Sequence, residues 1–246
     1  MIEVIDLHKA LDGTPILRGV DLEIPTGKTT AIMGPSGTGK SVFLKHIIGL
    51  YKPDRGKIVV DGIDTTSLDS RGWKELRKDK FGMLFQEGAL FDSMNVFDNV
   101  GFFLKEHTKL KRAEIARKVS EKLEIVGLHG VETKMPSELS GGMKRRVALA
   151  RAIIADPEIV LFDEPTVGLD PIICTSIIKL VKDTQEHLGI TFVMVTHNIR
   201  AGLSIAQKVA MLHEGKIVVS GTAEDVKKSE DPFVKHFLEE AEIGTV

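Results

Sequence analysis

The stretch from Gly34 to Ser41 carries the strongest chemical signal in the sequence. It reads GPSGTGKS and fits the pattern G-x-x-x-x-G-K-[S/T], whose glycines let backbone N–H groups turn inward around phosphate oxygens. The apolar run at residues 30–33 precedes it and apolar residues at helical spacing follow it. Strand, loop and helix is the order this site needs, because the helix adds its free N–H groups and positive end. The sequence therefore predicts a nucleotide phosphate site.

Each residue of this loop has an expected role. The Lys40 ammonium would reach the β- and γ-phosphates, and the Ser41 hydroxyl would ligate Mg²⁺. The predicted phosphate-binding set is Gly34, Pro35, Ser36, Gly37, Thr38, Gly39, Lys40, Ser41 and Val42. The alternative is a glycine-rich turn with an exposed lysine.

Two adjacent carboxylates supply the second chemical signal. Asp163 and Glu164 follow the apolar run at residues 159–162, which reads as a buried strand. Asp163 is placed to bind Mg²⁺ through water, and Glu164 is placed to polarise the water that attacks the γ-phosphate. The alternative is two ordinary acids at a strand end. A phosphate loop followed by an acidic strand end predicts hydrolysis of a nucleotide.

Composition limits the classes of protein to consider. The 246 residues include 42% hydrophobic and 28% charged residues, with a formal net charge of -2. These values are typical of a globular domain and give no general reason to expect a nucleic-acid partner. No apolar run approaches the eighteen or so residues needed to span a bilayer, and no signal segment is recognisable, so we expect a cytosolic chain. The single cysteine, Cys174, reads as a packing residue.

The elements that must position these residues alternate between strands and helices. Strands are expected at 3–7, 20–24, 57–60 (an edge strand), 81–85, 159–162 and 191–195, with a late hairpin at 209–213 and 217–219. Helices are expected after the phosphate loop, at 70–80, through 115–126, from 140 towards 155, from 170 to 189, and from 231. Nearly unbroken apolar runs favour a parallel central sheet. The pattern predicts an α/β core with a helical insertion near residues 88–156.

The run Leu139-Ser140-Gly141-Gly142-Met143 narrows the class. A serine N-cap and two glycines allow backbone N–H groups to approach an anion closely, although a plain serine-capped helix would look the same. The run resembles the L-S-G-G-Q signature of the ATP-binding cassette family. In that family two cassettes face each other, so the resemblance implies that Ser140, Gly141, Gly142 and Met143 contact the ATP held by a second copy.

Three further motifs in the family's order support the resemblance. They are Gln86, Gly168-Leu169-Asp170 and His197. The resemblance implies that Gln86 contacts Mg²⁺ and the attacking water, and that His197 contacts the γ-phosphate. Asp170 would serve the nucleotide site and cap a helix as well. The implied fold is a P-loop core with a RecA-like mixed sheet, an antiparallel β subdomain and an α-helical insertion.

The sequence also departs from the family's pattern. Leu11 stands where an aromatic residue commonly stacks on adenine, so the base would be contacted by apolar groups or by Lys9. Met143 replaces the final glutamine of the signature, and a thioether is a poor hydrogen-bond partner. Val42 stands where a second hydroxyl often contacts the α-phosphate in the family, so only its backbone N–H remains for that role. These departures do not remove Lys40, Ser41, Asp163 or Glu164. The resemblance covers nearly the whole chain, read as a single domain with a catalytic core at 1–87 and 157–246 and a helical subdomain at 88–156.

The region after Gln86 is similar to the ATPases of Mla-type, MCE-associated phospholipid transport systems. That resemblance implies a second copy, a membrane permease and MCE-domain or accessory subunits as partners, with ATP and Mg²⁺ as cofactors. It also implies a peripheral position on the cytoplasmic face of the inner membrane. A transporter ATPase for amino acids or ions, or a cassette that acts on DNA or ribosomes, remains the alternative. The expected docking groove, whose members could instead be core, comprises Leu90, Phe91, Met94, Phe97, Phe102 and Phe103.

Overall fold

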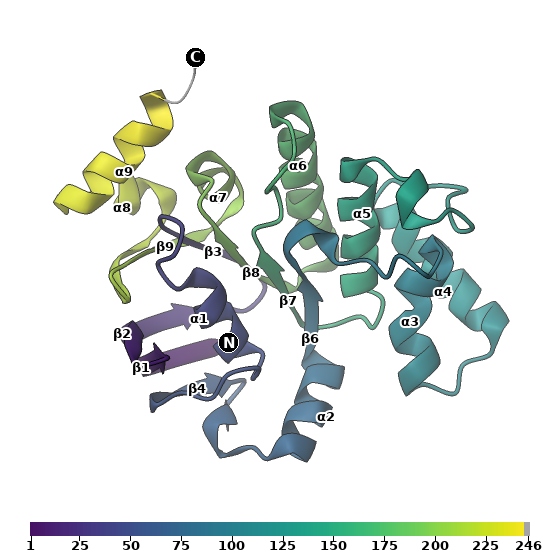
Figure 1. Ribbon diagram of the computed structural model, residues 1–246, viewed down its shortest axis with the longest axis horizontal. Coiled ribbons are helices and arrows are strands. Elements are labelled where there is room, and N and C mark those ends of the chain that lie inside the picture. The colour runs from purple at the N-terminus through teal and green to yellow at the C-terminus, as the bar shows by residue number, and fades with distance from the viewer. Residues whose placement is uncertain (244–246) are drawn as a thin grey trace. The chain divides into compact units, whose positions relative to one another are not determined.

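The computed structural model of the protein describes residues 1–243, and the side chains of residue 87 and residues 240–243 lie outside that description (Figure 1). The chain forms two compact units. The first unit comprises Met1–Arg77 and Thr191–Val246, and the second comprises Lys78–Ile190. Each unit holds part of the predicted site.

An antiparallel sheet forms one part of the first unit. Its strands are β1 (Ile2–Leu11), β2 (Thr14–Ile24), β4 (Arg55–Val60) and β5 (Ile63–Asp64), in the order β2-β1-β4-β5. Alternating buried residues give it one covered face. The prediction that residues 57–60 form an edge strand was wrong, because the short β5 pairs beyond β4. The Asp61-Gly62 turn between them has positive φ at both residues, the pattern of a tight hairpin.

A mixed sheet in the first unit carries the phosphate loop. Its strands are β3 (Thr29–Met33), β8 (Thr191–Thr196), β9 (Lys208–His213) and β10 (Lys216–Gly221), in the order β10-β9-β3-β8. Strand β3 runs parallel to both β8 and β9, whereas β10 is antiparallel to β9. Every residue of β3 and β8 is buried, as expected for strands covered on both faces.

Helices complete the first unit. They are α1 (Lys40–Ile47), α7 (Ile199–Ile205), α8 (Ala223–Lys227) and α9 (Pro232–Ile243), with the 3-10 turn η1 (Thr65–Ser67). Helix α2 (Ser70–Lys80), which was predicted, spans the boundary between the units. The three C-terminal helices bury Ile199, Val226, Val234 and Phe237 in one apolar cluster with residues of β3 and β9. Helices α7 and α8 were not predicted, because each is too short to show a helical period.

The second unit pairs two parallel strands and packs four helices. The strands are β6 (Phe81–Leu84) and β7 (Ile159–Asp163); the helices are α3 (Val96–His107), α4 (Arg112–Ile125), α5 (Gly141–Ala152) and α6 (Pro171–Leu188), with the 3-10 turns η2 (Gln86–Gly88) and η3 (Pro136–Glu138). Helix α6 begins after its Asp170 cap and ends at Gly189 with φ 64°, as predicted. Strand β6 stops at Leu84, so the expectation that Phe85 is buried in it was wrong; Phe85 is 42% exposed.

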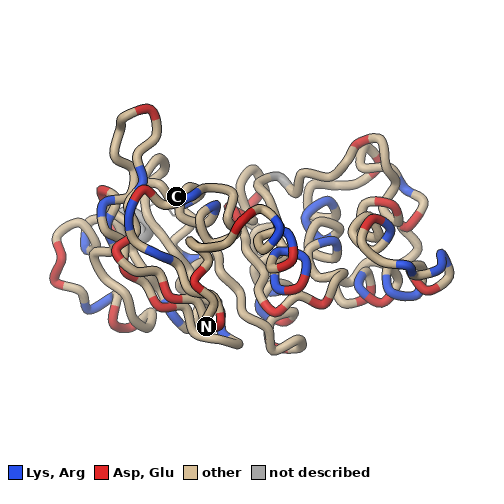
Figure 2. The backbone as a smooth tube through the Cα atoms, turned by 90° about the horizontal axis from the view of Figure 1, so that it is seen from below, with Lys and Arg blue, Asp and Glu red and all other residues tan. Residues whose placement is uncertain are grey.

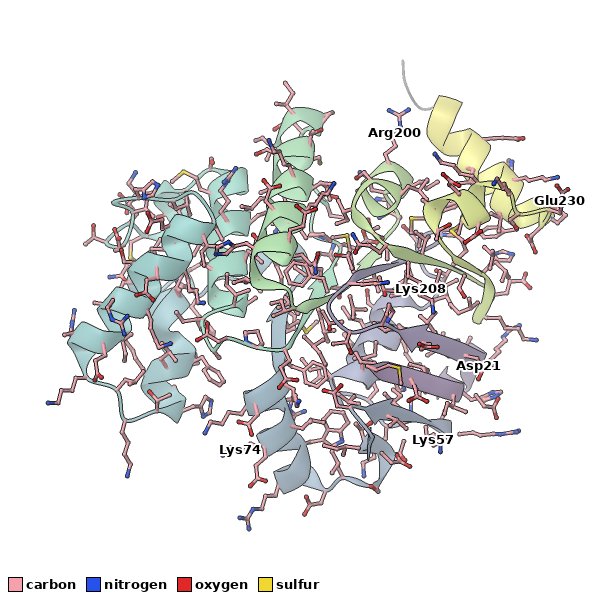
Figure 3. All side chains as sticks on the ribbon, turned by 180° about the vertical axis from the view of Figure 1, so that it is seen from behind. Asp21, Lys57, Lys74, Arg200, Lys208 and Glu230 are labelled. Carbon is pink, nitrogen blue, oxygen red and sulfur yellow. The ribbon has the colours of Figure 1, made fainter. Side chains whose placement is uncertain are left out.

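Charged residues of both signs are interspersed along the backbone of each unit (Figure 2). The labelled side chains Lys57 and Lys74 extend away from the ribbon, where water can solvate them (Figure 3). Within residues 1–243, none of the helices combines the length and the apolar character that crossing a membrane requires. The predicted α/β class is confirmed, with a mixed sheet and a separate antiparallel sheet. The predicted helical subdomain, residues 88–156, carries α3, α4, η3 and α5, and its standing as a subdomain stays a prediction.

Candidate functional site

The phosphate loop lies between β3 and α1 in the first unit, and its backbone requires glycine at two positions. Gly34 has φ 156°, and a Cβ added there would lie 2.3 Å from the carbonyl oxygen of Leu212. Gly39 caps α1 in the left-handed region with φ 98°, and its Cβ would lie 2.8 Å from the Ile16 side chain. Any side chain at these positions would displace a neighbour or strain the loop.

The loop is held closed by its own side chains. The Lys40 ammonium, 5% exposed, donates to the carbonyl oxygens of Gly34 and Pro35 at 2.9 Å each. The Thr38 hydroxyl donates to Pro35 O at 2.9 Å. Because the first turn of α1 carries no acidic side chain, its positive end is not neutralised locally. The lysine is therefore already positioned at the loop whose amides would receive phosphate.

The rest of the loop offers backbone and hydroxyl groups at the surface. Ser36 and Gly37 are exposed, whereas Ser41 and Val42 are half-buried in the first turn of α1. The Val42 carbonyl oxygen lies 2.7 Å from Nδ1 of His46, one turn along the helix. Burial lowers the pKa of His46. The histidine thus packs as a neutral ring on the core side of α1.

His197 also belongs to the first unit. It follows β8 and is exposed, immediately before Asn198, the N-cap of α7. The Asn198 side chain accepts from the Ala201 N–H at 3.0 Å, and the Thr196 hydroxyl accepts from the Asn198 N–H at 3.0 Å. Two local hydrogen bonds therefore define the turn that presents His197.

In the second unit, the two carboxylates lie at the end of β7. Asp163 is 7% exposed and Glu164 is 9% exposed. Glu164 has φ 48°, a left-handed conformation that is uncommon for a residue other than glycine. Such strain persists only where the surroundings enforce it, and it is frequent at functional sites.

An arginine from α5 fixes the loop that follows these carboxylates. Arg145 is 5% exposed, and its guanidinium donates to the carbonyl oxygens of Pro165 at 3.1 Å and Val167 at 2.8 Å. The fork spans the residues that follow Glu164, so α5 helps to set the conformation of the chain after the two carboxylates. Sequence reasoning missed Arg145, since its partners are backbone carbonyls and carry no residue-type signal.

The signature glycines pack against the turn that contains Asp170. A Cβ on Gly141 would lie 3.1 Å from Leu169, and one on Gly142 would lie 3.0 Å from Ile173. The Ser140 hydroxyl accepts from the Met143 N–H at 3.3 Å, and Asp170 caps α6 by accepting from two N–H groups. The structure therefore brings the signature and the Gly168–Asp170 turn together, with the N-termini of α5 and α6 side by side.

Gln86 opens η2 and is exposed, next to the exposed Phe85. The six residues of the predicted docking groove come after Gln86 in the chain. Phe91 is 44% exposed, whereas the other five members are half-buried, so none of the six is buried in the core as the alternative required.

Cys174 is half-buried and its Sγ lies near Thr166 O and Leu169 O, which agrees with a packing role. Burial raises the pKa of its thiol.

Lys9, offered for the adenine, already has partners in the first unit. Its ammonium donates to Asp54 at 2.8 Å and to Lys52 O at 3.0 Å. Its side chain is 17% exposed. The structure thus places this lysine in a local ion pair, and the pKa of Asp54 lies below its usual range because of hydrogen bonds from Lys9 and the Ala10 amide.

A cavity of about 560 Å³ lies away from the phosphate loop, between α7 and α9 of the first unit. Its wall includes Leu203 and Leu238 with Arg200, Lys227 and Lys235. Arg200 extends outward from the end of α7 (Figure 3). None of the residues assigned to catalysis lines this cavity, so its size does not mark the nucleotide site.

Comparisons with known proteins agree with the motifs. A family model described as "ABC transporter" matches residues 17–167, more than half of the chain. The intermembrane phospholipid transport system ATP-binding protein MlaF of Escherichia coli K12 is 44% identical over 246 residues, which cover 100% of this chain and 91% of that protein. The probable ribonucleotide transport ATP-binding protein mkl of Mycobacterium leprae is 44% identical over 245 residues, which cover 100% of this chain and 70% of that protein.

Solved structures show the same fold. The ATP-binding cassette MJ0796, in a dimeric post-hydrolysis state bound to ADP and Pi, aligns with a TM-score of 0.81 at 32% identity, over 91% of this chain and 99% of that chain. CbiO1 of Clostridium perfringens, part of the ABC transporter complex cbiONQ, aligns with a TM-score of 0.85 at 31% identity, over 97% of this chain and 98% of that chain. The predicted RecA-like cassette architecture is therefore confirmed.

Proposed function

Since this chain belongs to the ABC transporter family and is an ATPase of that family, we propose that two copies close on two ATP molecules and drive a membrane permease that moves phospholipid between membranes. The observation that carries the proposal is the phosphate loop, with Lys40 folded across the carbonyls of Gly34 and Pro35. At two of its glycines, Gly34 and Gly39, an added side chain would collide with Leu212 O or with Ile16.

The residues present fit the Mg²⁺ that accompanies ATP. The Ser41 hydroxyl and the Asp163 carboxylate would hold it, because a hard cation takes oxygen ligands and magnesium is usually bound by one or two carboxylates plus substrate phosphates. When bound, the ion neutralises charge on the β- and γ-oxygens. Gln86 would contribute a further oxygen. The ion would be held by one hydroxyl, one carboxylate and one amide, together with the phosphates.

Glu164 orients and polarises the attacking water in this proposal. Its near-complete burial keeps bulk water from competing, and its left-handed backbone fixes the direction of the side chain. His197 contacts the γ-phosphate, and Lys40 binds the β- and γ-phosphates. Ser140 to Met143 of the second copy, with the open N-terminus of α5, complete the anion site, and Asp170 lies beside them.

Closure on ATP would then move the predicted docking groove and hence the permease. A chain that acts through such a permease is peripheral, on the cytoplasmic face of the inner membrane. MCE-domain and accessory subunits are expected in the same assembly. Phospholipid is favoured as cargo because the MlaF proteins, which this chain covers at 91–93% of their length, carry that name. The name of mkl, ribonucleotide transport, supplies the competing cargo.

Exchange of Glu164 for glutamine tests the chemistry. Glu164→Gln keeps the size of the side chain, but its amide cannot accept the proton of water, so we expect hydrolysis to fall by at least about 100-fold with ATP binding retained. Lys40→Ala should instead weaken ATP binding itself. Equilibrium binding of a fluorescent ATP analogue and steady-state phosphate release measure the two effects. Normal hydrolysis by Glu164→Gln would contradict the assigned base.

Purification of the tagged chain from its native membrane tests the cargo. Extraction in a mild detergent, followed by identification of the retained proteins and extracted lipids, should give a permease together with phospholipid. Stimulation of ATP hydrolysis by phospholipid vesicles, and not by ribonucleotides, would support the same reading. A ribosome or DNA in place of a permease would refute a transport function.

A further inference from the structure

The segment after Gln86, residues 88–94, is held at both ends by side chains of the second unit, and we call it the docking segment. At its first end, Arg151 of α5 donates from Nη2 to Gly88 O at 2.6 Å and from Nη1 to Ala89 O at 2.8 Å. Both acceptors are backbone atoms, so the fork fixes the chain path and not a side-chain rotamer. A planar guanidinium is suited to this two-point grip, which an ammonium cannot reproduce.

The gripped backbone is not one that the chain adopts without support. Gly88 has φ 82° and Ala89 has φ 43°, both in the left-handed region. A Cβ on Gly88 would lie 3.2 Å from Ala148, so the segment packs directly on α5. Arg151 is half-buried, and this burial lowers the pKa of its guanidinium. The two carbonyl oxygens are therefore significant partners for that charge.

Asn99 of α3 holds the second end. It is fully buried, and its Oδ1 accepts from the Phe91 N–H at 2.8 Å. Its Nδ2 donates to Phe91 O at 3.1 Å and Met94 O at 2.8 Å. A buried amide with its hydrogen bonds satisfied is a rigid connection, because breaking any one of them leaves a polar group without water.

The Phe91 backbone is held by Asn99, whereas the residue remains 44% exposed. Its ring centroid is 5.1 Å from that of Phe102, and the Arg151 guanidinium lies 5.7 Å from it. The same arginine thus touches both the backbone and the most exposed aromatic ring of the predicted groove. Movement of Arg151 would therefore move the part of the predicted docking groove that contains Phe91.

Arg151 stands at the far end of the helix that begins at the signature. Helix α5 runs from Gly141 to Ala152 after its Ser140 cap, so about 16 Å along the helix axis separates Ser140 from the Cα of Arg151. A continuous helix transmits a displacement of one end to the other with little loss. Among the described arginines of α5, Arg145 grips the loop after Glu164 and Arg146 grips Val126 O and Ser176.

We propose that Arg151 is a positioning residue that couples nucleotide binding at the signature end of α5 to the docking segment. This rests on the proposed function, in which ATP occupies the signature of a second copy. When α5 shifts to engage that ATP, the Arg151 fork carries Gly88, Ala89 and the exposed Phe91 with it. Without the fork, ATP still binds but the docking segment no longer responds.

Hydrogen–deuterium exchange in the hydrolysis-deficient Glu164→Gln chain tests the coupling. Peptides that cover residues 88–94 are followed with Mg·ATP and with Mg·ADP. We expect ATP to slow their exchange in the parent chain, and Arg151→Lys to reduce this ATP-dependent difference several-fold while ATP affinity stays within about twofold. A merely structural role would change exchange equally with both nucleotides and would leave the difference intact.

Arg146→Lys is the matched control, because it removes an equivalent fork from the same helix at residues away from the docking segment. It should retain the full ATP-dependent difference. Should Arg151→Lys unfold, Arg151→Gln, whose neutral amide donates from a single nitrogen, serves for the same measurement. An undiminished difference in a folded Arg151 variant, or no ATP-dependent difference in the parent chain, would overturn the proposal.

A second readout separates this proposal from the proposed function. Phe91→Ser removes the exposed ring but not the Arg151 fork, so it should reduce recovery of the membrane partner and leave the ATP-dependent exchange difference unchanged. If Phe91→Ser recovers the partner fully, the docking role of the groove is wrong. The exchange result for Arg151 does not depend on the recovery of a membrane partner, because it is measured on the chain alone.

Discussion

Gly34 and Glu164 hold uncommon backbone conformations for different reasons. At Gly34 the neighbouring strand leaves no room, because an added Cβ would lie 2.3 Å from Leu212 O. At Glu164 a full side chain is kept at φ 48°, which costs energy that the fold must offset. The Arg145 fork to Pro165 O and Val167 O is one contact that enforces it. The missing side chain at Gly34 allows the Leu212 carbonyl of β9 to approach closely, whereas the backbone conformation of Glu164 fixes the direction of a carboxylate.

The importance of the close approach at Gly34 can be tested by adding a side chain there. Gly34→Ala forces the loop or strand β9 to shift, since the obstacle is a backbone atom, so we expect a loss of about 1–3 kcal/mol in the free energy of unfolding and weakened ATP binding. Urea unfolding and ATP titration measure the two effects. Gly13→Ala is the matched control: its φ is 79° and nothing lies within 4 Å of the added Cβ. If both variants lose the same free energy of unfolding and both still bind ATP, the close approach at Gly34 is unimportant.

At the scale of elements, the sequence predicts the helices and strands whose start and stop signals lie within the element itself. Helix α6 has its Asp170 cap, Pro171 and terminal Gly189, and β3, β7 and β8 are apolar runs bounded by turns. Helices α7 and α8 carry too few residues to show a helical period, although Asn198 and Thr222 cap their N-termini. The docking segment shows the same limit. Its anchors, Arg151 and Asn99, bind backbone atoms, and contacts of this kind leave no pattern of residue types from which they could be predicted.

Helix α1 contains a group whose ionisation should affect stability. Burial lowers the pKa of His46, whose ring packs near Tyr51 and lies in the field of Lys9 and Asp54. Its Nε2 is buried without a hydrogen-bond partner among the described residues, so a proton there would be poorly compensated. As pH falls below about 6.5, the unfolded chain gains a proton that the folded chain resists, and the free energy of unfolding decreases.

Substitution by asparagine removes that titration. His46→Asn retains a donor near Val42 O but carries no ionisable ring, so its stability should depend less on pH between about 5 and 7 than that of the native chain. Urea unfolding at pH 7.5 and 5.5 measures the difference for each protein. Because the other seven histidines are common to both chains, they cancel in the comparison. An identical pH dependence would show that His46 protonates as readily in the folded chain as in the unfolded one.

At the scale of the whole molecule, the sequence motifs predict the chemistry of the site more completely than they predict how its parts are assembled. The phosphate loop, the carboxylates, the signature and the Asp170 turn could all be identified by residue type, and within the second unit the signature does pack on that turn. The prediction that a second copy completes the site depends on the family and not on a contact within this chain. The dimeric cassette bound to ADP and Pi, at 32% identity, is consistent with it.

Ser140 offers a way to test the second copy without harming the fold. Asp caps a helix as well as serine does, and its charge is favourable at a helix N-terminus, so Ser140→Asp should fold normally. The same charge would repel the γ-phosphate held by the other copy. In the Glu164→Gln background with Mg·ATP, we therefore expect Ser140→Asp to remain monomeric in size-exclusion chromatography with light scattering. Ser140→Asn caps equally well without charge and should still form the dimer. Dimers of Ser140→Asp at the same ATP concentration would mean that the signature does not face the phosphate of the partner, and that the closed assembly forms through another surface.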